Sequence, residues 1–273
     1  MVPVTIRFSG YQPPQSVHSR AAQVFGAALR DRLGDEVRFT FDGDVTAGGH
    51  KAADLLTMVE SGDLEMCYFA SSYLSGRVPA LELLDLPFTI TDRVQAYRLL
   101  DGELGALLTA QVAESTGYRL LGFWDNGFRH FSNDTRPIRR PADCKGLRIR
   151  TLFSEMHRRC FAMLGFEPVA LDVQELRAAV ASGRVDAQEN PLTTLHVFGL
   201  HAHHRYVTLS GHFFGTALLL CNAAAHARWP EVVQAAVRQA AIEATAAQRG
   251  FAAAEDETVL AVLRRAGTEG ISL

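Results

Sequence analysis

The first half of the chain alternates between segments with strand periodicity and segments with helix periodicity. Val2, Val4, Ile6 and Phe8 recur at every second position, which predicts a strand. Ser16 is a suitable N-cap for the helical pattern that follows it. The alternation continues with a strand over 37–41, a helix over 55–61, a strand over 64–69, a helical segment over 93–114 that is interrupted at Gly102, and a strand over 118–124. This order of elements predicts an α/β domain.

A second unit of the same kind is predicted from about residue 126. The expected strands cover 128–132, 147–150, 185–187, 206–209 and 216–221, and the expected helices cover 154–164 and 172–183. From Pro230 to about Ala266 the chain is rich in residues that favour helices, with Pro at the start. We therefore predict one long helix, or two abutting helices, near the end of the chain.

Composition and charge exclude several classes of function. The chain has 273 residues, of which 48% are hydrophobic, and a formal net charge of -3, so no basic surface for nucleic acid or anionic membrane is expected. No apolar run approaches the roughly 20 residues that span a bilayer. Met1 leads directly into a strand pattern and not into a signal peptide, so this start is either native or replaces a removed leader.

The cysteine pattern is typical of buried free thiols. The four cysteines, at 67, 144, 160 and 221, form no C-x-x-C pair and lie mostly in apolar segments. Disulfides are neither required nor excluded by this spacing.

Two predicted strands end in polar side chains that suit an organic anion. Arg150 ends the strand over 147–150, and Asn190 follows the strand that begins at Val185. A guanidinium is a planar, permanently charged donor that fits a carboxylate with two parallel hydrogen bonds. Arg148 shares a face with Arg150, so strand alternation alone leaves both arginines as candidates. The combination indicates a protein that binds an acid.

Motifs of catalysis and metal binding are absent from the sequence. It contains no G-x-S-x-G, H-E-x-x-H, P-loop or G-x-G-x-x-G pattern. Ser210-Gly211-His212 and the Asp186/Glu189 pair give only a weak case for an enzyme. His201, His203 and His204 cluster, but we interpret them as a polar helix end and loop and not as metal ligands. We therefore expect no enzyme activity, no cofactor and no metal.

A series of motifs resembles the solute-binding proteins of tripartite ATP-independent periplasmic (TRAP) transporters, the DctP-like family. Segment 136–150 resembles the family pattern RPI..P.D.KG.KIR, and segment 164–168 resembles LGA.P. Segment 183–191 resembles G.VDG.ENP, with Ala187 where glycine is usual, and His212 and Asn222 flank a strand as in the family. The resemblance extends from about Val4 to Gly267.

This resemblance implies a two-domain α/β fold like that of periplasmic binding proteins, with hinge strands, a ligand cleft between the domains and closure on binding. The first domain would cover 1–125 and 214–250, the second 126–213, a domain-spanning helix 230–266 and a shortened C-terminal end 267–273. The implied partners are a small carboxylate and TRAP membrane subunits. The implied location is the periplasm after removal of a leader, and we expect a monomer that is not embedded in the membrane.

The resemblance also selects site residues. It assigns Arg150 as the carboxylate clamp and Arg129 as a second arginine, and it supports Asn190 as a ligand contact. Because open α/β sheets bind ligands at their strand ends, further side chains near strand ends and domain crossovers are candidates. These further candidates are Gln12, Phe69, Ser71, Phe213 and Trp124.

Two other functions remain open from the sequence. A ligand-sensing receptor would use the same cleft with a different partner. A small α/β hydrolase or metal-dependent enzyme would need turnover, which a binding protein does not show.

Overall fold

The computed structural model describes residues 3–273, except for the side chain of Glu257, and shows a mixed α/β fold with nine strands. Val2, predicted to begin the first strand, lies outside the described residues. The chain divides into two compact units. Unit 1 consists of Met1–Ala70, Leu99–Asp125 and Thr216–Phe251, and unit 2 consists of Ser71–Arg98, Asn126–Gly215 and Ala252–Leu273. Unit 2 thus includes Ser71–Arg98, a segment that the family resemblance implied to be part of the first domain.

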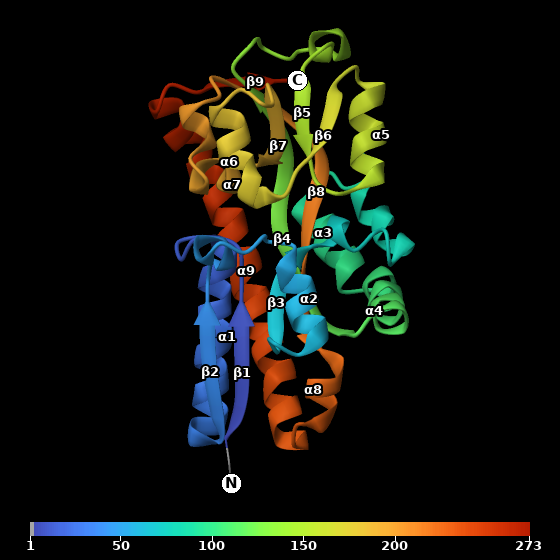
Figure 1. Cartoon of the computed structure of the whole chain (residues 1–273), viewed down its shortest axis with the longest axis vertical. Helices are drawn as coiled ribbons and strands as arrows, with labels where there is room; N and C mark the ends of the chain where they lie inside the picture. The colour runs from blue at the N-terminus through green and yellow to red at the C-terminus, as the bar shows by residue number, and fades with distance from the viewer. Residues whose placement is uncertain (1–2) are drawn as a thin grey trace. The chain divides into compact units, whose positions relative to one another are not determined.

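Unit 1 is built around strands in the order β2-β1-β3-β8. β1 (Val4–Ser9) pairs in parallel with β2 (Val37–Asp42) and β3 (Met66–Ala70), while β3 pairs antiparallel with the later part of β8 (Tyr206–Asn222). Figure 1 shows α1 beside β1 and β2. The helices that lie in this unit are α1 (Val17–Leu33), α2 (Asp54–Ser61), α4 (Glu103–Ser115), α8 (Ala223–Arg228) and the first part of α9 (Glu231–Arg265).

Aromatic side chains fill the core of unit 1. Phe8 of β1 packs edge-on against Phe25 of α1, with ring centroids 5.8 Å apart, and against Tyr68 of β3 at 6.3 Å. All three side chains are almost completely buried. Edge-to-face contacts of this kind add to the free energy gained by burying the rings. They attach α1 to the parallel strands and explain why the N-terminal pattern forms a sheet with a helix against it.

Unit 2 contains a second set of strands in the order β4-β7-β5-β6. β7 pairs antiparallel with the later part of β4 and in parallel with β5, and β5 pairs in parallel with β6. β9 pairs in parallel with the first part of β8. The bounds are β4 (Tyr118–Asn133), β5 (Arg148–Thr151), β6 (Glu167–Ala170), β7 (Ala187–Pro191), β9 (Glu269–Ser272), α3 (Arg93–Leu100), α5 (Glu155–Met163), α6 (Val173–Ala181) and α7 (Leu192–Val197).

Two apolar clusters hold the helices of unit 2 in place. One joins α6, α7, the start of β8 and the end of α9, and it includes Leu176, Leu195 and Leu263. The other joins β4, β5 and α5 and includes Phe131, Ile149 and Phe161. Burying a side chain of this size contributes about 1.5–3 kcal/mol. The second cluster lies beside the polar residues described below and gives them a rigid support.

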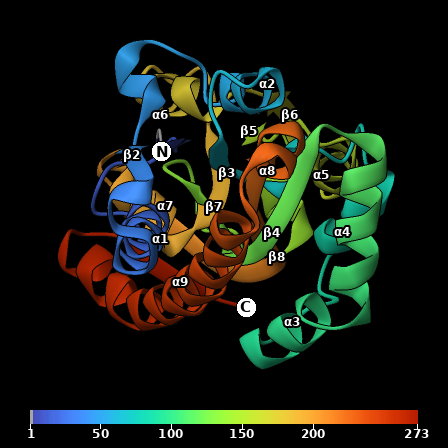
Figure 2. The ribbon, with the colours of Figure 1, turned by 90° about the horizontal axis from the view of Figure 1, so that it is seen from below.

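The structure corrects several predicted boundaries. The strands expected at 118–124 and 128–132 are one strand, β4, and those expected at 206–209 and 216–221 are one strand, β8. β6, α7, α8 and β9 were not predicted. α9 is a single helix, which Figure 2 shows without a break, and its residues 231–251 belong to unit 1 while 252–265 belong to unit 2.

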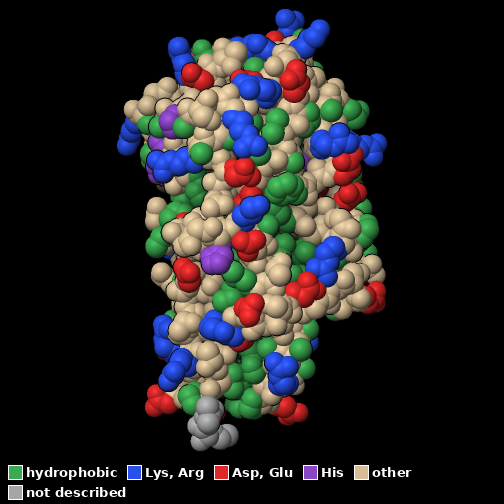
Figure 3. Space-filling view, in the orientation of Figure 1, with side chains coloured by type: hydrophobic (Ala, Val, Ile, Leu, Met, Phe, Trp, Pro, Cys, Tyr) green, Lys and Arg blue, Asp and Glu red, His purple; other side chains and the backbone are tan. Residues whose placement is uncertain are grey.

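All four cysteines are free thiols. Cys67, Cys144 and Cys221 are buried free thiols, and Cys160 is a half-buried free thiol. On the face drawn in Figure 3, lysine and arginine side chains are interspersed with acidic ones. Among residues 3–273, no helix combines the length and the apolar character that a membrane span requires.

Candidate functional site

Arg150 occupies the interior of unit 2 at the third position of β5. The pairing of β5 with β6 and β7 places it opposite Val169 and Gln188, and its side chain is completely buried. The guanidinium Nε donates to the carbonyl oxygen of Leu171 at 3.0 Å, and Nη2 donates to the hydroxyl of Tyr73 at 3.4 Å. Among the described residues, the buried Nη1 atom has no hydrogen-bond partner. The ion pairs found among those residues do not include Arg150, so only neutral oxygens hold its positive charge.

The structure distinguishes Arg148 from Arg150, which strand alternation left equivalent. Arg148 donates through Nε and Nη2 to the carboxylate of Asp186, at 2.9 and 2.7 Å, and its side chain is 43% exposed. Its charge is therefore compensated at the surface. The opposite holds for Arg150, whose charge is buried and lacks a carboxylate partner within the described chain.

Arg129, the second predicted arginine, is paired with an acidic residue of its own unit. Its Nη2 lies 2.8 Å from Oε1 of Glu189 and 2.9 Å from the Glu189 carbonyl oxygen, and its Nε donates to Oε2 of the same carboxylate. Both side chains are almost completely buried. A bidentate pair of this kind satisfies the charge of Arg129 without a ligand.

Electrostatics keep Glu189 ionised within this buried pair. Burial alone would raise the pKa of the Glu189 carboxyl, but the charge of Arg129 and the nearby ring of His212 lower it to a net value below the ordinary range. The ring of His212 stacks on Phe131 with centroids 4.2 Å apart. Burial lowers the pKa of His212, and Glu189 opposes that shift. Arg129, Glu189 and His212 therefore form one coupled polar group beside the apolar cluster.

Asn190 lies inside β7 and not in the turn after a strand. It is the register partner of His130 on β4 and is 5% exposed. Its Oδ1 accepts a hydrogen bond from Nη2 of Arg129 at 3.2 Å, and its Nδ2 donates to Oε1 of Gln188 at 2.5 Å. The structure thus brings two of the predicted residues, Arg129 and Asn190, into direct contact.

A short 3-10 turn over Ser71–Tyr73 adds further polar groups to unit 2. Ser71 is buried, and its hydroxyl has no hydrogen-bond partner among the described residues. Burial raises the pKa of Tyr73, and the charge of Arg150 opposes that shift, so the phenol stays protonated at neutral pH. The hydroxyl of Ser72 donates to Asp85 Oδ1 at 2.9 Å, and that carboxylate oxygen lies 3.2 Å from Nε2 of His157.

The remaining predicted residues are buried in their own units. Phe213 of unit 2 stacks on His157 with centroids 4.4 Å apart and belongs to the cluster around Phe131. In unit 1, Trp124 donates from Nε1 to Thr245 Oγ1 at 3.1 Å, and Phe69 packs against Tyr11 at 4.9 Å. Gln12 of unit 1 accepts a hydrogen bond from Ser19 through its backbone carbonyl. Their assignment as ligand contacts stays a prediction.

Sequence reasoning missed three residues that shape this region. Glu189 stands in the quoted motif between Gln188 and Asn190, and a buried arginine nearby should have suggested an internal acidic partner. Tyr73 follows the predicted strand over 64–69 by only a few residues. Gln188 was passed over because its contacts depend on strand pairing, which local patterns do not specify.

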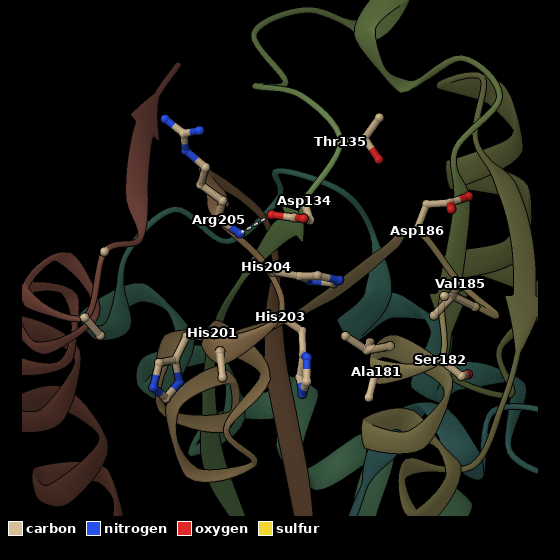
Figure 4. A pocket seen from close by; sticks show the side chains of 15 residues that line it. Asp134, Thr135, Ala181, Ser182, Val185, Asp186, His201, His203, His204 and Arg205 are labelled. Atoms are coloured by element: carbon tan, nitrogen blue, oxygen red, sulfur yellow. Dashed lines mark hydrogen bonds between the residues drawn. The ribbon is translucent and has the colours of Figure 1, made fainter.

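The predicted histidine cluster lines a separate cavity of unit 2. This cavity of about 660 Å³ includes His201, His203 and His204, with Asp134 and Asp186 on its walls. Figure 4 shows the ring of His204 extending into it between Asp134 and Ala181. Within the described part of the chain, no group of three or more His, Cys, Asp or Glu side chains is placed to hold a metal ion.

Comparisons with known proteins agree on one family. The model of the family DctP, bacterial extracellular solute-binding protein family 7, matches residues 8–273. The 2,3-diketo-L-gulonate-binding periplasmic protein YiaO of Escherichia coli is 30% identical over 269 residues, which cover 98% of this chain and 81% of YiaO.

Solved structures of TRAP periplasmic solute-binding proteins share the fold. One from Sulfurospirillum deleyianum, with bound succinate, has a TM-score of 0.94 and 26% identity and covers all of this chain and 89% of its own. Another, from Roseobacter denitrificans with bound β-D-glucuronate, has a TM-score of 0.94 and 26% identity and covers 98% of this chain and 88% of its own.

Proposed function

The chain belongs to the DctP family, family 7 of the bacterial extracellular solute-binding proteins, and from this premise we propose that it binds a small organic acid through Arg150 and delivers it to TRAP membrane subunits. The protein acts as a carrier and leaves the acid chemically unchanged. It works in the periplasm, as a monomer, and its membrane partners do the transport.

The single observation that carries this proposal is the state of Arg150. Its guanidinium is completely buried, its Nη1 lacks a hydrogen-bond partner among the described residues, and its other donors meet only neutral oxygens. A buried charge without a partner is costly. A ligand carboxylate would supply both the opposite charge and the missing acceptor, so Arg150 favours binding of an anion.

The neighbouring groups support the same class of ligand. We assign Arg129 and Asn190 as residues that assist Arg150: Asn190 contacts the ligand, and Arg129, already paired with Glu189, orients the Asn190 amide. Ser71 is a further donor, because its buried hydroxyl has no partner among residues 3–273. Gln12, Phe69, Trp124 and Phe213 are proposed as further ligand contacts, and the ring of Phe213 is held by stacking on His157.

The relatives indicate which acids should be tried first. YiaO is named for 2,3-diketo-L-gulonate, and the two solved structures contain succinate and β-D-glucuronate. These molecules share a carboxylate and several further oxygen acceptors. We therefore propose sugar acids and dicarboxylates as the ligand class of this chain.

A thermal-shift screen followed by calorimetry tests the proposal. The purified protein is screened against succinate, D-glucuronate, D-galactonate and other sugar acids, because a ligand that binds only the folded state raises the melting temperature. Each acid that binds is then compared with its methyl ester or amide. We expect the neutral derivative to bind at least about a hundredfold more weakly, since the buried guanidinium loses its charged acceptor. Equal affinity for acid and ester would refute a carboxylate clamp at Arg150.

A further inference from the structure

A continuous chain of buried hydrogen bonds leads from Asn190 to the cavity at His204. Asn190 Nδ2 donates to Gln188 Oε1 at 2.5 Å, and Gln188 Nε2 donates to the hydroxyl oxygen of Ser132. The Ser132 oxygen lies 2.9 Å from Nδ1 of His204. All four side chains are at most 5% exposed, so each of these bonds is shielded from solvent.

The direction of every bond in this chain follows from Arg129. A guanidinium can only donate, so the Asn190 atom that faces Arg129 must be the oxygen Oδ1. The amide nitrogen of Asn190 then faces Gln188, which must accept through its own oxygen and donate through its nitrogen. Ser132 accepts that bond, and among the described residues its own proton has no other acceptor than Nδ1 of His204, so the hydroxyl donates to that nitrogen. His204 is therefore the acceptor and carries its own proton on Nε2.

Strand register explains why these residues meet. Gln188 of β7 is the register partner of both Ser132 on β4 and Arg150 on β5. Directly paired residues share one face of a sheet, and Asn190 shares that face because it lies two positions along β7. The polar chain is thus a row of neighbours on two strands, β7 and β4, and His204 forms its outer end.

We propose that Ser132, Gln188 and His204 are positioning residues that lock the Asn190 amide with its oxygen toward Arg129, so that its remaining N–H is offered to an acceptor on the ligand. This inference rests on the proposed function in assigning Asn190 to the ligand. It deepens that function by requiring, beside the carboxylate held by Arg150, an oxygen acceptor placed to meet the Asn190 donor. Succinate and D-glucuronate both have such an acceptor.

The protonation state of His204 agrees with its role as acceptor. Burial lowers the pKa of His204 to about 4, so the ring is neutral at neutral pH. A neutral ring holds one proton, and the bond to Ser132 places it on Nε2. Since His204 lines the cavity of Figure 4, this N–H can be satisfied from the solvent side.

The test combines NMR of the ligand-free protein with matched variants. We expect long-range ¹⁵N–¹H spectra to show His204 as the neutral Nε2–H tautomer. The NMR signals of the Asn190 side-chain amide are identified as those that disappear in the Asn190→Asp variant. His204→Leu should shift the Asn190 amide signals, because it removes the terminal acceptor. His204→Asn should restore them, because its side-chain oxygen can take the place of Nδ1. His203→Leu, which alters the cavity but not the chain of hydrogen bonds, should leave them unchanged.

Binding of succinate and D-glucuronate supplies the functional measurement. His204→Leu should weaken binding about three- to tenfold, the range for one lost hydrogen bond, and His204→Asn should recover most of that loss. An Nδ1–H tautomer, or Asn190 signals that do not respond to His204→Leu, would overturn the inference. So would affinities for both acids that are the same in His204→Leu as in the wild type. If neither acid binds the wild-type protein, the proposed ligand class fails while the NMR spectra still decide whether His204 positions Asn190.

Discussion

Nη2 of Arg129 lies 2.8 Å from Oε1 of Glu189, in an ion pair whose two side chains are almost excluded from solvent. The carboxylate also lies 3.5 Å from Nε2 of His212, and the charge of Arg129 and the nearby His212 ring outweigh the effect of burial and hold the pKa of Glu189 below the ordinary range. This arrangement divides the two buried arginines of unit 2 by role. Arg129 is neutralised by the protein itself, while Arg150 has no acidic partner among the described residues.

We expect Glu189→Gln to destabilise the protein by about 3–5 kcal/mol, because removing one partner leaves the Arg129 charge buried and unpaired. The free energy of unfolding, measured by urea titration, checks this. Glu155→Gln is the matched control, since Glu155 pairs with Arg158 at the surface with both side chains more than half exposed, and such pairs contribute little to stability. Similar losses in the two variants would contradict the distinction between the pairs.

We expect Arg150→Ala to weaken binding of the preferred acid by about 2–5 kcal/mol while the protein stays folded, because a charge-assisted pair is lost. Arg150→Lys should also be impaired, since an ammonium group lacks the planar fork. Titration calorimetry measures both effects, with circular dichroism as the check on folding. Arg148→Ala removes a neighbouring arginine that already pairs with Asp186, and its affinity should equal that of the wild type. A folded Arg150→Ala variant with unaltered affinity would exclude Arg150 from the ligand site.

Local sequence patterns predicted most strands and helices but not the continuity of β4 and β8. Gly127 lies between the strands predicted over 118–124 and 128–132, and Gly211 lies between those predicted over 206–209 and 216–221; a glycine within a strand pattern often marks a bulge or a bend. In the structure both have positive φ, 91° and 53°, and the strands continue through them. A glycine can allow a strand to bend without ending it, and the sequence pattern alone does not distinguish a bend from the end of a strand.

The sequence predicted site residues whose role depends on their own side chain and position in a strand, but it did not predict contacts between residues that are far apart in the chain. Arg150 ends a predicted strand, and the family resemblance separated it from Arg148. The contacts of Asn190 depend on the pairing of β7 with β4, whose paired residues are far apart in sequence. A shift of one residue in that register would turn every side chain to the other face, so the link from Asn190 to Ser132 requires the structure.

We expect Gly127→Ala to destabilise the protein by about 1–3 kcal/mol. Gly127 has a φ of 91°, and a Cβ atom there would lie 2.9 Å from Cβ of Pro191, so the variant combines backbone strain with a close contact. Gly76→Ala is the control, because its position has no close neighbour and no positive φ. Thermal and urea unfolding measure both variants. A Gly127→Ala protein as stable as Gly76→Ala would show that β4 adjusts at this point without strain.

Unit 1 contains a buried histidine that should make stability depend on pH. The ring of His18 stacks on Tyr68 with centroids 5.0 Å apart, and neither ring nitrogen has a hydrogen-bond partner among the described residues. Burial lowers the pKa of His18 to about 3. The unfolded chain takes up a proton at this histidine as the pH falls below about 6.5, while the folded protein does not until the pH nears the lowered value. The free energy of unfolding must therefore decrease as the pH falls from neutrality.

We expect this single group to cost about 2 kcal/mol between pH 7.5 and pH 5, since the slope approaches about 1.4 kcal/mol per pH unit once the unfolded histidine is protonated. His18→Phe cannot bind a proton, so its stability should fall less over that interval by the same amount. Urea unfolding at pH 7.5 and at pH 5 measures the free energy of unfolding of each protein. The loss between the two pH values is compared between proteins, so a change in packing that affects both pH values equally cancels. His50→Phe, which replaces a histidine with a 53% exposed side chain, is the control for the loss of a histidine at the surface. Equal losses of stability in His18→Phe and the wild type would mean that His18 is protonated in the folded protein and that its buried ring has found a partner.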